Sequence, residues 1–186
     1  MNVALPAPAS ESTLVEALRR GEVWAFDAVF EEYRPRVYGF LLRLCGQREL
    51  AEDLLQETFL RLARSAGQLR PDTRLRPYLF TIAHNLHRSH RRWAWVDGER
   101  LLALGRRLRS GPPTPIDDAS ASELGRRLEA ALAALPEASR EVALLVLVEG
   151  MEPMEAAEIL NLRADALRQR LSRARAALSE AIGEKP

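Results

Sequence analysis

The sequence predicts an all-α protein in which two small helical domains are joined by a flexible linker. Apolar residues recur at helical spacing along almost the whole chain, and no run of alternating β-branched residues indicates a strand. One stretch, GPPTPIDDASAS at residues 111–122, is rich in proline, serine and acidic residues, as linkers are. The 186 residues suffice for two domains with a modest core each.

The first domain is expected at residues 12–96, behind a disordered tail at residues 1–11. Gly21 and Gly67 mark helix ends, because glycine readily terminates a helix. Pro35 falls inside a periodic segment, where its missing N–H and its ring are expected to kink or divide the helix. The periodicity predicts helices at residues 12–20, 23–45, 49–65 and 75–95.

The second domain is expected at residues 123–182, after a linker at residues 97–122. Helical periodicity resumes once the linker composition ends, and Pro136 separates the first two helices of this domain. No internal repeat of fixed period is found, and this second all-α domain is expected to be the smaller of the two. The predicted helices lie at residues 124–135, 137–149, 153–160 and 164–182.

The last two of these helices have the spacing of a DNA-binding helix-turn-helix, which a tight helical hairpin of another kind can share. Ala157 is small where the two helices must approach, and Asn161 tolerates the left-handed backbone of a sharp turn. Leu167 then anchors the second helix. Glu152 and Arg163 stand where a capping serine or threonine is common, and each missing cap is expected to cost about 1 kcal/mol.

The second helix of this motif separates an inward apolar face from an outward polar face. Projected on a helical wheel, the inward face consists of Leu167, Leu171, Ala174 and Leu178. The outward face carries groups able to read bases, namely Gln169, Ser172 and Arg173, and arginines able to bind phosphates, namely Arg168, Arg170 and Arg175. This layout predicts a recognition helix for the DNA major groove.

Two basic patches far apart in the sequence predict two contacts with a polyanion. Residues 84–109 contain seven arginines and two acidic residues, and residues 163–175 contain five arginines and one acidic residue. The formal net charge of the whole chain is only +1, so the placement of the arginines, not their number, indicates nucleic acid.

One predicted helix, AEDLLQETFLRLAR at residues 51–64, combines a core-facing stripe with a compact polar face. The stripe consists of Leu54, Leu55, Phe59 and Leu62. The polar face consists of Glu52, Asp53, Gln56 and Glu57. From these residues alone, the polar face can be either a solvated surface or a docking surface for another protein.

The sequence argues against several classes of function. No apolar run approaches the roughly 18 residues of a membrane span, and the N-terminus lacks a secretory signal, so a cytoplasmic protein is expected. No phosphate-binding glycine loop, nucleophile elbow or HExxH motif occurs, so neither an enzyme nor a cofactor is expected. His84, His87 and His90 drift around their helix without a neighbouring carboxylate or cysteine, so no metal site is expected.

Three stretches together resemble the extracytoplasmic-function (ECF) sigma factors, the compact two-domain promoter-recognition subunits of bacterial RNA polymerase. AEDLLQETF at residues 51–59 is similar to the signature of sigma region two. YLFTIAHNLHRSHRR at residues 78–92 is similar to the segment that engages the −10 element. LPEASREVALLVLVEG at residues 135–150, followed by the helix-turn-helix, resembles sigma region four. The resemblance covers residues 12–96 and 123–180.

The resemblance implies partners and the residues that meet them. The clamp helices of the polymerase β′ subunit are expected to contact Asp53, Leu54, Leu55, Gln56 and Glu57, and the β flap to contact region four. The −10 element is expected to contact Tyr78, Asn85, Arg88, Arg91 and Arg92, with Asn85 near a base flipped from the non-template strand. The −35 element is expected to contact Arg168, Gln169, Arg170, Ser172, Arg173 and Arg175. An anti-sigma factor is a further expected partner.

The favoured hypothesis is therefore a sigma factor that binds core polymerase and directs promoter-specific initiation, and two alternatives remain open. A helix-turn-helix regulator that acts without polymerase would leave the acidic face at residues 52–57 without a role. A sigma-like protein that mainly titrates a partner would bind polymerase or an inhibitor without supporting transcription.

Overall fold

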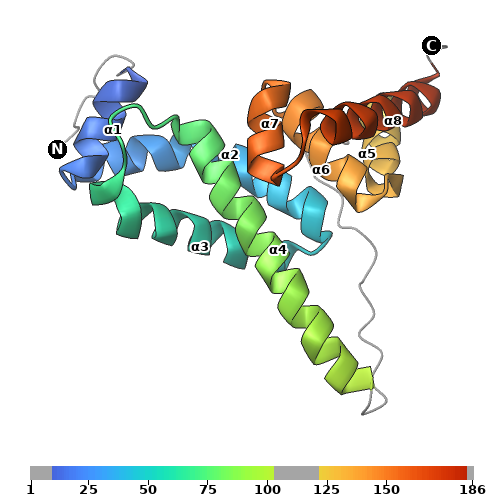
Figure 1. Ribbon diagram of the computed structural model, residues 1–186, viewed down its shortest axis with the longest axis horizontal. Helices are drawn as coiled ribbons and strands as arrows, with labels where there is room; N and C mark the ends of the chain where they lie inside the picture. The colour runs from blue at the N-terminus through green and yellow to red at the C-terminus, as the bar shows by residue number, and fades with distance from the viewer. Residues whose placement is uncertain (1–9, 103–121, 184–186) are drawn as a thin grey trace.

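The computed structural model describes residues 10–102 and 122–183, and of residues 93–102 the backbone alone. Within these ranges all regular secondary structure is helical, which confirms the predicted all-α class. Figure 1 shows α1–α4 on one side of the molecule and α5–α8 on the other. The elements are α1 (Glu11–Arg19), α2 (Val23–Cys45), α3 (Arg48–Ser65), η1 (Ala66–Gln68), α4 (Leu75–Leu102), α5 (Glu123–Ala134), α6 (Glu137–Ala143), the π-helical turn η2 (Leu144–Val148), α7 (Pro153–Leu160) and α8 (Ala164–Ile182).

Pro35 does not divide α2, which runs without interruption from Val23 to Cys45. Tyr33 and Val37, on either side of the proline, are both buried. A proline in a helix interior costs about 3 kcal/mol, and burial of the flanking apolar side chains offsets a cost of that size. Of the two outcomes expected at Pro35, a kink or a division, division of the helix was therefore wrong, because tertiary packing outweighs the local defect.

The fourth helix is longer than the sequence predicts. It was expected to end near residue 95, with a linker starting at residue 97, but α4 continues to Leu102. The rest of the expected linker, residues 103–121, and most of the expected tail, residues 1–9, lie outside the described residues.

The core of the first domain lies between α2, α3 and α4. Phe40 of α2 and Phe80 of α4 meet edge to face, with their ring centroids 5.2 Å apart. Leu62 of α3 is fully buried, as are Leu75 and Leu79 of α4. Each such side chain contributes about 2 kcal/mol by leaving water. These contacts fix which sides of α3 and α4 face the solvent.

The second domain contains the predicted helix-turn-helix, formed by α7 and α8. Asn161 ends α7 with φ 51° and ψ 50°, the left-handed conformation expected there. The N–H of Leu162 donates to the Ala157 carbonyl oxygen over 2.8 Å, which closes the turn. The expectation that α7 lacks a cap was wrong, because the Glu155 carboxylate accepts the backbone N–H of Glu152 over 3.2 Å. At the start of α8, Arg163 forms no side-chain cap.

The two domains contact each other through a surface that we call the domain junction. Figure 1 shows α4 passing beside α7, and α2 also contacts α6. The described residues include four ion pairs and one histidine–carboxylate pair that cross this junction, and in each of these the arginine or histidine belongs to the first domain. The pairs are Arg36–Glu149, Arg43–Glu129, Arg74–Glu155, His84–Glu141 and Arg91–Glu137.

None of the helices within the described ranges has both the length and the apolar character that crossing a bilayer requires.

Candidate functional site

The polar face of α3 is presented to solvent on an apolar base. Asp53 and Gln56 are exposed, whereas Leu54 below them is buried and Leu55 is half-buried. The buried side of α3 holds the helix in place. The exposed carboxylate and amide groups therefore have defined positions for a partner to contact. The geometry can therefore serve as a docking surface for a partner that presents basic and polar groups.

Glu57 differs from the other polar residues of this face because cations of its own helix surround it. Arg61 Nε lies 2.9 Å from Glu57 Oε1, and Arg64 Nη1 lies 3.8 Å from the same oxygen. A partner that used Glu57 would have to compete with these arginines. Asp53 and Gln56 are therefore the sharper candidates for specific contacts.

The candidates for the −10 element lie along α4, but they are not equally accessible. Asn85, Arg88 and Arg92 are exposed. Tyr78 is half-buried, and its hydroxyl forms a 2.8 Å hydrogen bond with Ser65 Oγ at the end of α3. Arg91 is exposed but forms an ion pair with Glu137 of the second domain. Asn85, Arg88 and Arg92 are therefore the more exposed candidates for contact with a nucleic-acid strand, although Arg88 and Arg92 also border the cavity described below.

The candidates for the −35 element lie on the side of α8 that faces away from its own domain. The four residues of the predicted inward face, Leu167, Leu171, Ala174 and Leu178, are all buried. The exposed residues are Arg168, Gln169, Ser172, Arg173 and Arg175. Arg170 is half-buried, which sets it apart from its neighbours. An outward row of amide, hydroxyl and guanidinium groups can read base edges and bind phosphates.

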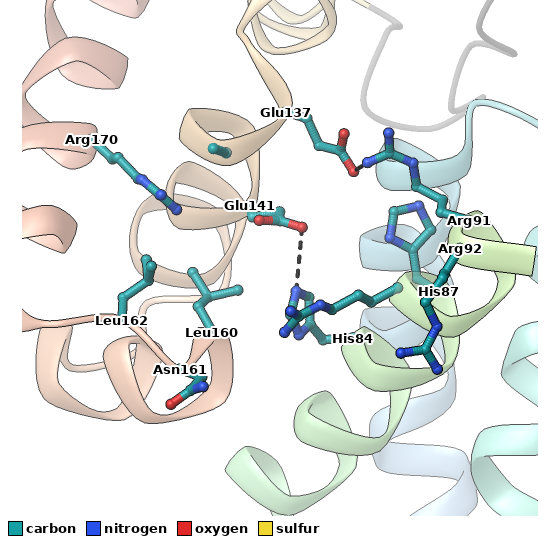
Figure 2. Close-up of a pocket in the computed structure, with 12 residues that line it drawn as sticks. His84, His87, Arg91, Arg92, Glu137, Glu141, Leu160, Asn161, Leu162 and Arg170 are labelled. Atoms are coloured by element: carbon teal, nitrogen blue, oxygen red, sulfur yellow. Dashed lines mark hydrogen bonds and ion pairs between the residues drawn. The ribbon is translucent and has the colours of Figure 1, made fainter. Parts of the chain in front are cut away.

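A cavity of about 610 Å³ at the domain junction brings the two candidate DNA surfaces together. Arg91 and Arg92 of α4 line it from one side, and Arg170 of α8 lines it from the other (Figure 2). Arg88 of α4 also lines this cavity. In this arrangement, part of the −10 candidate set therefore faces part of the −35 candidate set. A DNA duplex cannot enter a space of this size, so both sets become fully accessible only when the domains separate.

Two histidines are buried beside this cavity. His84 Nε2 lies 3.2 Å from Glu141 Oε1, as the dashed line in Figure 2 shows. Burial lowers the pKa of His87 to about 4, so that its imidazole is neutral at pH 7. Burial also disfavours ionised Glu141, but the hydrogen bond and charge of His84, with His87 and Arg170 nearby, lower its pKa overall.

This cluster could not be predicted from the sequence, because its parts come from different domains. No carboxylate lies near the histidines along the chain, but α6 places Glu137 and Glu141 against them across the junction. His90, the third histidine of the series, is exposed and lies outside the group. Only the spacing of Glu137 and Glu141, four residues apart on one helix, was visible in the sequence.

Comparison with known proteins gives two matching family models and a set of relatives. The model described as Sigma-70 region 2 matches residues 29–95, and the model described as Sigma-70, region 4 matches residues 125–178. The chain is 37% identical to RNA polymerase sigma factor CarQ of Myxococcus xanthus, over 91% of this chain and 96% of that protein. It is 32% identical to ECF RNA polymerase sigma factor SigE of Mycolicibacterium smegmatis, over 86% of this chain and 62% of that protein.

Two solved structures share the arrangement of helices. One is the sigma factor RpoE in complex with the anti-sigma factor NepR from Bartonella quintana, with a TM-score of 0.74 and 24% identity over 88% of this chain and 100% of that chain. The other is CnrH in complex with the cytosolic domain of CnrY, with a TM-score of 0.68 and 24% identity over 96% of this chain and 100% of that chain. At this level of identity the likeness shows a common fold.

Proposed function

Because the chain belongs to the extracytoplasmic-function sigma factors, we propose that it brings core RNA polymerase to the −10 and −35 elements of its promoters through three separate surfaces. The function of the family is promoter-specific initiation of transcription. The residues that carry each contact are the part that we infer for this chain. The polymerase performs the chemistry, and this subunit selects the promoter and helps to open the strands.

The surface for core polymerase is the polar face of α3, with Asp53 and Gln56 at its centre. Both side chains are exposed above the buried Leu54. Their carboxylate and amide groups suit the basic and polar side chains of the β′ clamp helices. Leu55 and Glu57, both half-buried, complete the edge of this contact. Such a surface supplies register and specificity more than raw affinity.

The two DNA surfaces are proposed to bind different promoter elements. Asn85, with Arg88 and Arg92, is proposed to hold the separated strand at the −10 element, where a flipped base needs a polar pocket. Gln169 and Arg173 on α8 are proposed to read base edges at the −35 element. Two moderate contacts on one chain reinforce each other, because binding of one raises the effective concentration of the other.

Two further protein contacts are proposed. The β flap is expected to meet region four at exposed apolar side chains of the second domain, namely Leu124, Leu128, Leu147 and Val148. An anti-sigma factor is expected to regulate the chain, in line with the anti-sigma factor NepR that is bound to RpoE in one of the two solved structures. We place this activity in the cytoplasm, where bacterial polymerase acts.

The observation that carries this proposal is the presence, in one chain, of the α3 docking face and a solvent-facing recognition helix. A DNA-binding regulator that acts without polymerase would account for α8 alone, and the match to Sigma-70 region 2 at residues 29–95 argues against it. The experiment is reconstitution: purified chain and core polymerase should co-elute on gel filtration at low ionic strength.

The reconstituted holoenzyme should then initiate at promoters identified by mapping transcript starts after overproduction of the chain. Initiation that depends on the added chain supports the proposal. Co-elution without initiation would favour a protein that titrates its partner, and failure to co-elute would overturn the α3 assignment.

A further inference from the structure

Four side chains able to bind a metal meet at the domain junction. His84 and His87 project from α4, and Glu137 and Glu141 project from α6 (Figure 2). One ligand atom each from His87, Glu137 and Glu141 lies within 4.8 Å of the other two. His84 Nε2 lies 3.2 Å from Glu141 Oε1. The group therefore joins an i, i+3 pair on one helix to an i, i+4 pair on another.

The histidine at the centre of this group is buried and lacks a partner for one of its nitrogens. The exposed fraction of His87 is only 2%, and its Nδ1 has no hydrogen-bond partner among the described residues. An unpaired buried polar atom costs about 1–3 kcal/mol, so a fold rarely retains one without a compensating contact. The imidazole that carries this nitrogen belongs to a cluster that already contains two carboxylates.

We propose that His87, Glu137 and Glu141 bind a divalent transition metal such as Zn²⁺ at the domain junction, with His84 positioning Glu141. Imidazole nitrogen and carboxylate oxygen are ligands that Zn²⁺ takes at about 2.0–2.2 Å. Three protein ligands leave one position for water, as in open zinc sites. The His84–Glu141 hydrogen bond orients the carboxylate, as second partners of metal ligands commonly do.

Arginines surround the cluster, and a bound ion must displace the one that pairs with Glu137. Arg91 forms an ion pair with Glu137, and Arg88, Arg92 and Arg170 line the same cavity. The side chain of Arg91 is 57% exposed, so it can swing into solvent when a metal replaces it as the counter-charge of Glu137. The positive surroundings weaken binding of a cation, so removal of Arg91 should tighten it.

The ligands come from both domains, and this gives the ion a regulatory consequence. A metal that needs α4 and α6 together binds the closed arrangement alone and stabilises it in proportion to its concentration. Closure also keeps Arg88, Arg92 and Arg170 turned toward a shared cavity. The metal is therefore an inhibitor of promoter binding, a consequence that rests on the proposed function, whereas metal binding itself does not.

The test is titration of the full-length, metal-free chain with Co²⁺, followed by visible absorption, with Zn²⁺ as competitor. One Co²⁺ per chain should bind and be displaced by Zn²⁺. The variants His87→Gln, Glu137→Gln and Glu141→Gln should each weaken binding at least tenfold. Arg91→Ala should tighten it several-fold. His90→Gln, on the same helix but exposed, should leave it unchanged.

Three results of the titration would each overturn the proposal: no stoichiometric binding, binding unaffected by Glu137→Gln, or equal loss in the His90→Gln control. Glu137 is 34% exposed, so its variant is expected to fold, which circular dichroism checks. The second readout is energy transfer between two dyes, one in each domain. Addition of Zn²⁺ to the wild-type chain should raise this energy transfer, because the metal favours the closed arrangement. Binding without that rise would place the ion away from the junction. Neither readout requires polymerase, so failure here is distinct from failure of the proposed function.

Discussion

Arg43 of α2 and Glu129 of α5 form a two-pronged ion pair across the domain junction, although 86 residues separate them in the chain. Nε lies 3.1 Å from one carboxylate oxygen and Nη2 lies 2.7 Å from the other. The two side chains are only 14% and 20% exposed. Protection from solvent makes this pair a stronger link between the domains than the exposed pairs around it.

Reversal of one charge in this pair should open the junction. In Arg43→Glu two carboxylates would face each other, and the double variant Arg43→Glu with Glu129→Arg should restore closure. The coupling energy is expected to be about 1–3 kcal/mol, because the pair is charge-assisted and partly desolvated. Energy transfer between two dyes, one in each domain, measures how closed the junction is in each variant. Arg70→Glu, which disrupts the exposed pair with Asp72 inside the first domain, is the matched control.

If closure survived Arg43→Glu unchanged, the ion pairs would not hold the domains together and apolar contacts between α4 and α7 would have to do so. If the double variant failed to recover closure, the loss would reflect general damage and not the removal of a specific pair.

Substitution of Glu149 and substitution of Arg36, which form an ion pair, should change the free energy of unfolding differently. Burial raises the pKa of Glu149, and the charge and hydrogen bond of Arg36 only partly oppose this. Arg36 also donates to the Glu149 carbonyl oxygen over 3.2 Å, a contact that survives in Glu149→Gln. Glu149→Gln should therefore leave the free energy of unfolding unchanged or raise it slightly at pH 7. Arg36→Ala removes the cation that is hydrogen-bonded to this buried carboxylate and should lower that free energy by about 1–3 kcal/mol.

The pH dependence of the same pair has a definite sign. Because the pKa of Glu149 is higher in the folded protein than in the unfolded chain, ionisation of this group works against folding. Its stabilising contribution is complete below the unfolded pKa and is lost as the pH rises through the folded pKa. Any advantage of Glu149→Gln should therefore be present at neutral pH and vanish as the pH falls toward the ordinary glutamate range. Urea unfolding at a series of pH values measures this, and an advantage that grew as the pH fell would contradict the assignment.

The double variant Asp53→Ala with Gln56→Ala should lower affinity for core polymerase and leave the fold intact. Both side chains are exposed, so their removal touches no core contact. Loss of two polar contacts at an interface is expected to weaken binding by about 1–3 kcal/mol in total. Competition for core polymerase against the wild-type chain measures it. Glu31→Ala, which removes an exposed acid from α2, is the control, and equal effects of the two changes would indicate a general charge effect.

The helices could be predicted from the sequence because their signals are local. The bounds of α7 and α8 were predicted as observed, since Pro153 starts one helix and Asn161 supplies the left-handed residue between them. The buried face of α8 could likewise be predicted from the helical spacing of its apolar residues, which is also a local signal. Features that depend on partners distant in sequence were not predictable in this way.

Two features of the structure could not be predicted because they depend on contacts between separate helices. Pro35 lies inside a continuous helix because Tyr33 and Val37 are packed into a core whose other walls come from α3 and α4. The contact between His84 and Glu141 joins residues 57 positions apart, and no periodicity within α4 or α6 indicates their pairing. In both cases the deciding interaction lies between elements, whereas sequence patterns report on one element at a time.

Arg173→Ala should weaken discrimination between correct and altered −35 sequences by about 1–3 kcal/mol, the value of one bidentate contact to a guanine. Arg173 lies on the outward side of α8, opposite the buried Leu171 and Ala174, so its removal leaves the packing of the domain unchanged. Arg175→Ala, at the edge of the same face, should instead weaken binding to all sequences equally, because a phosphate contact carries no base information. Holoenzyme binding to a promoter and to single-base variants of its −35 element measures both. If Arg173→Ala also lowered affinity uniformly, Arg173 would be a phosphate-binding residue and Gln169 would remain as the base-reading candidate.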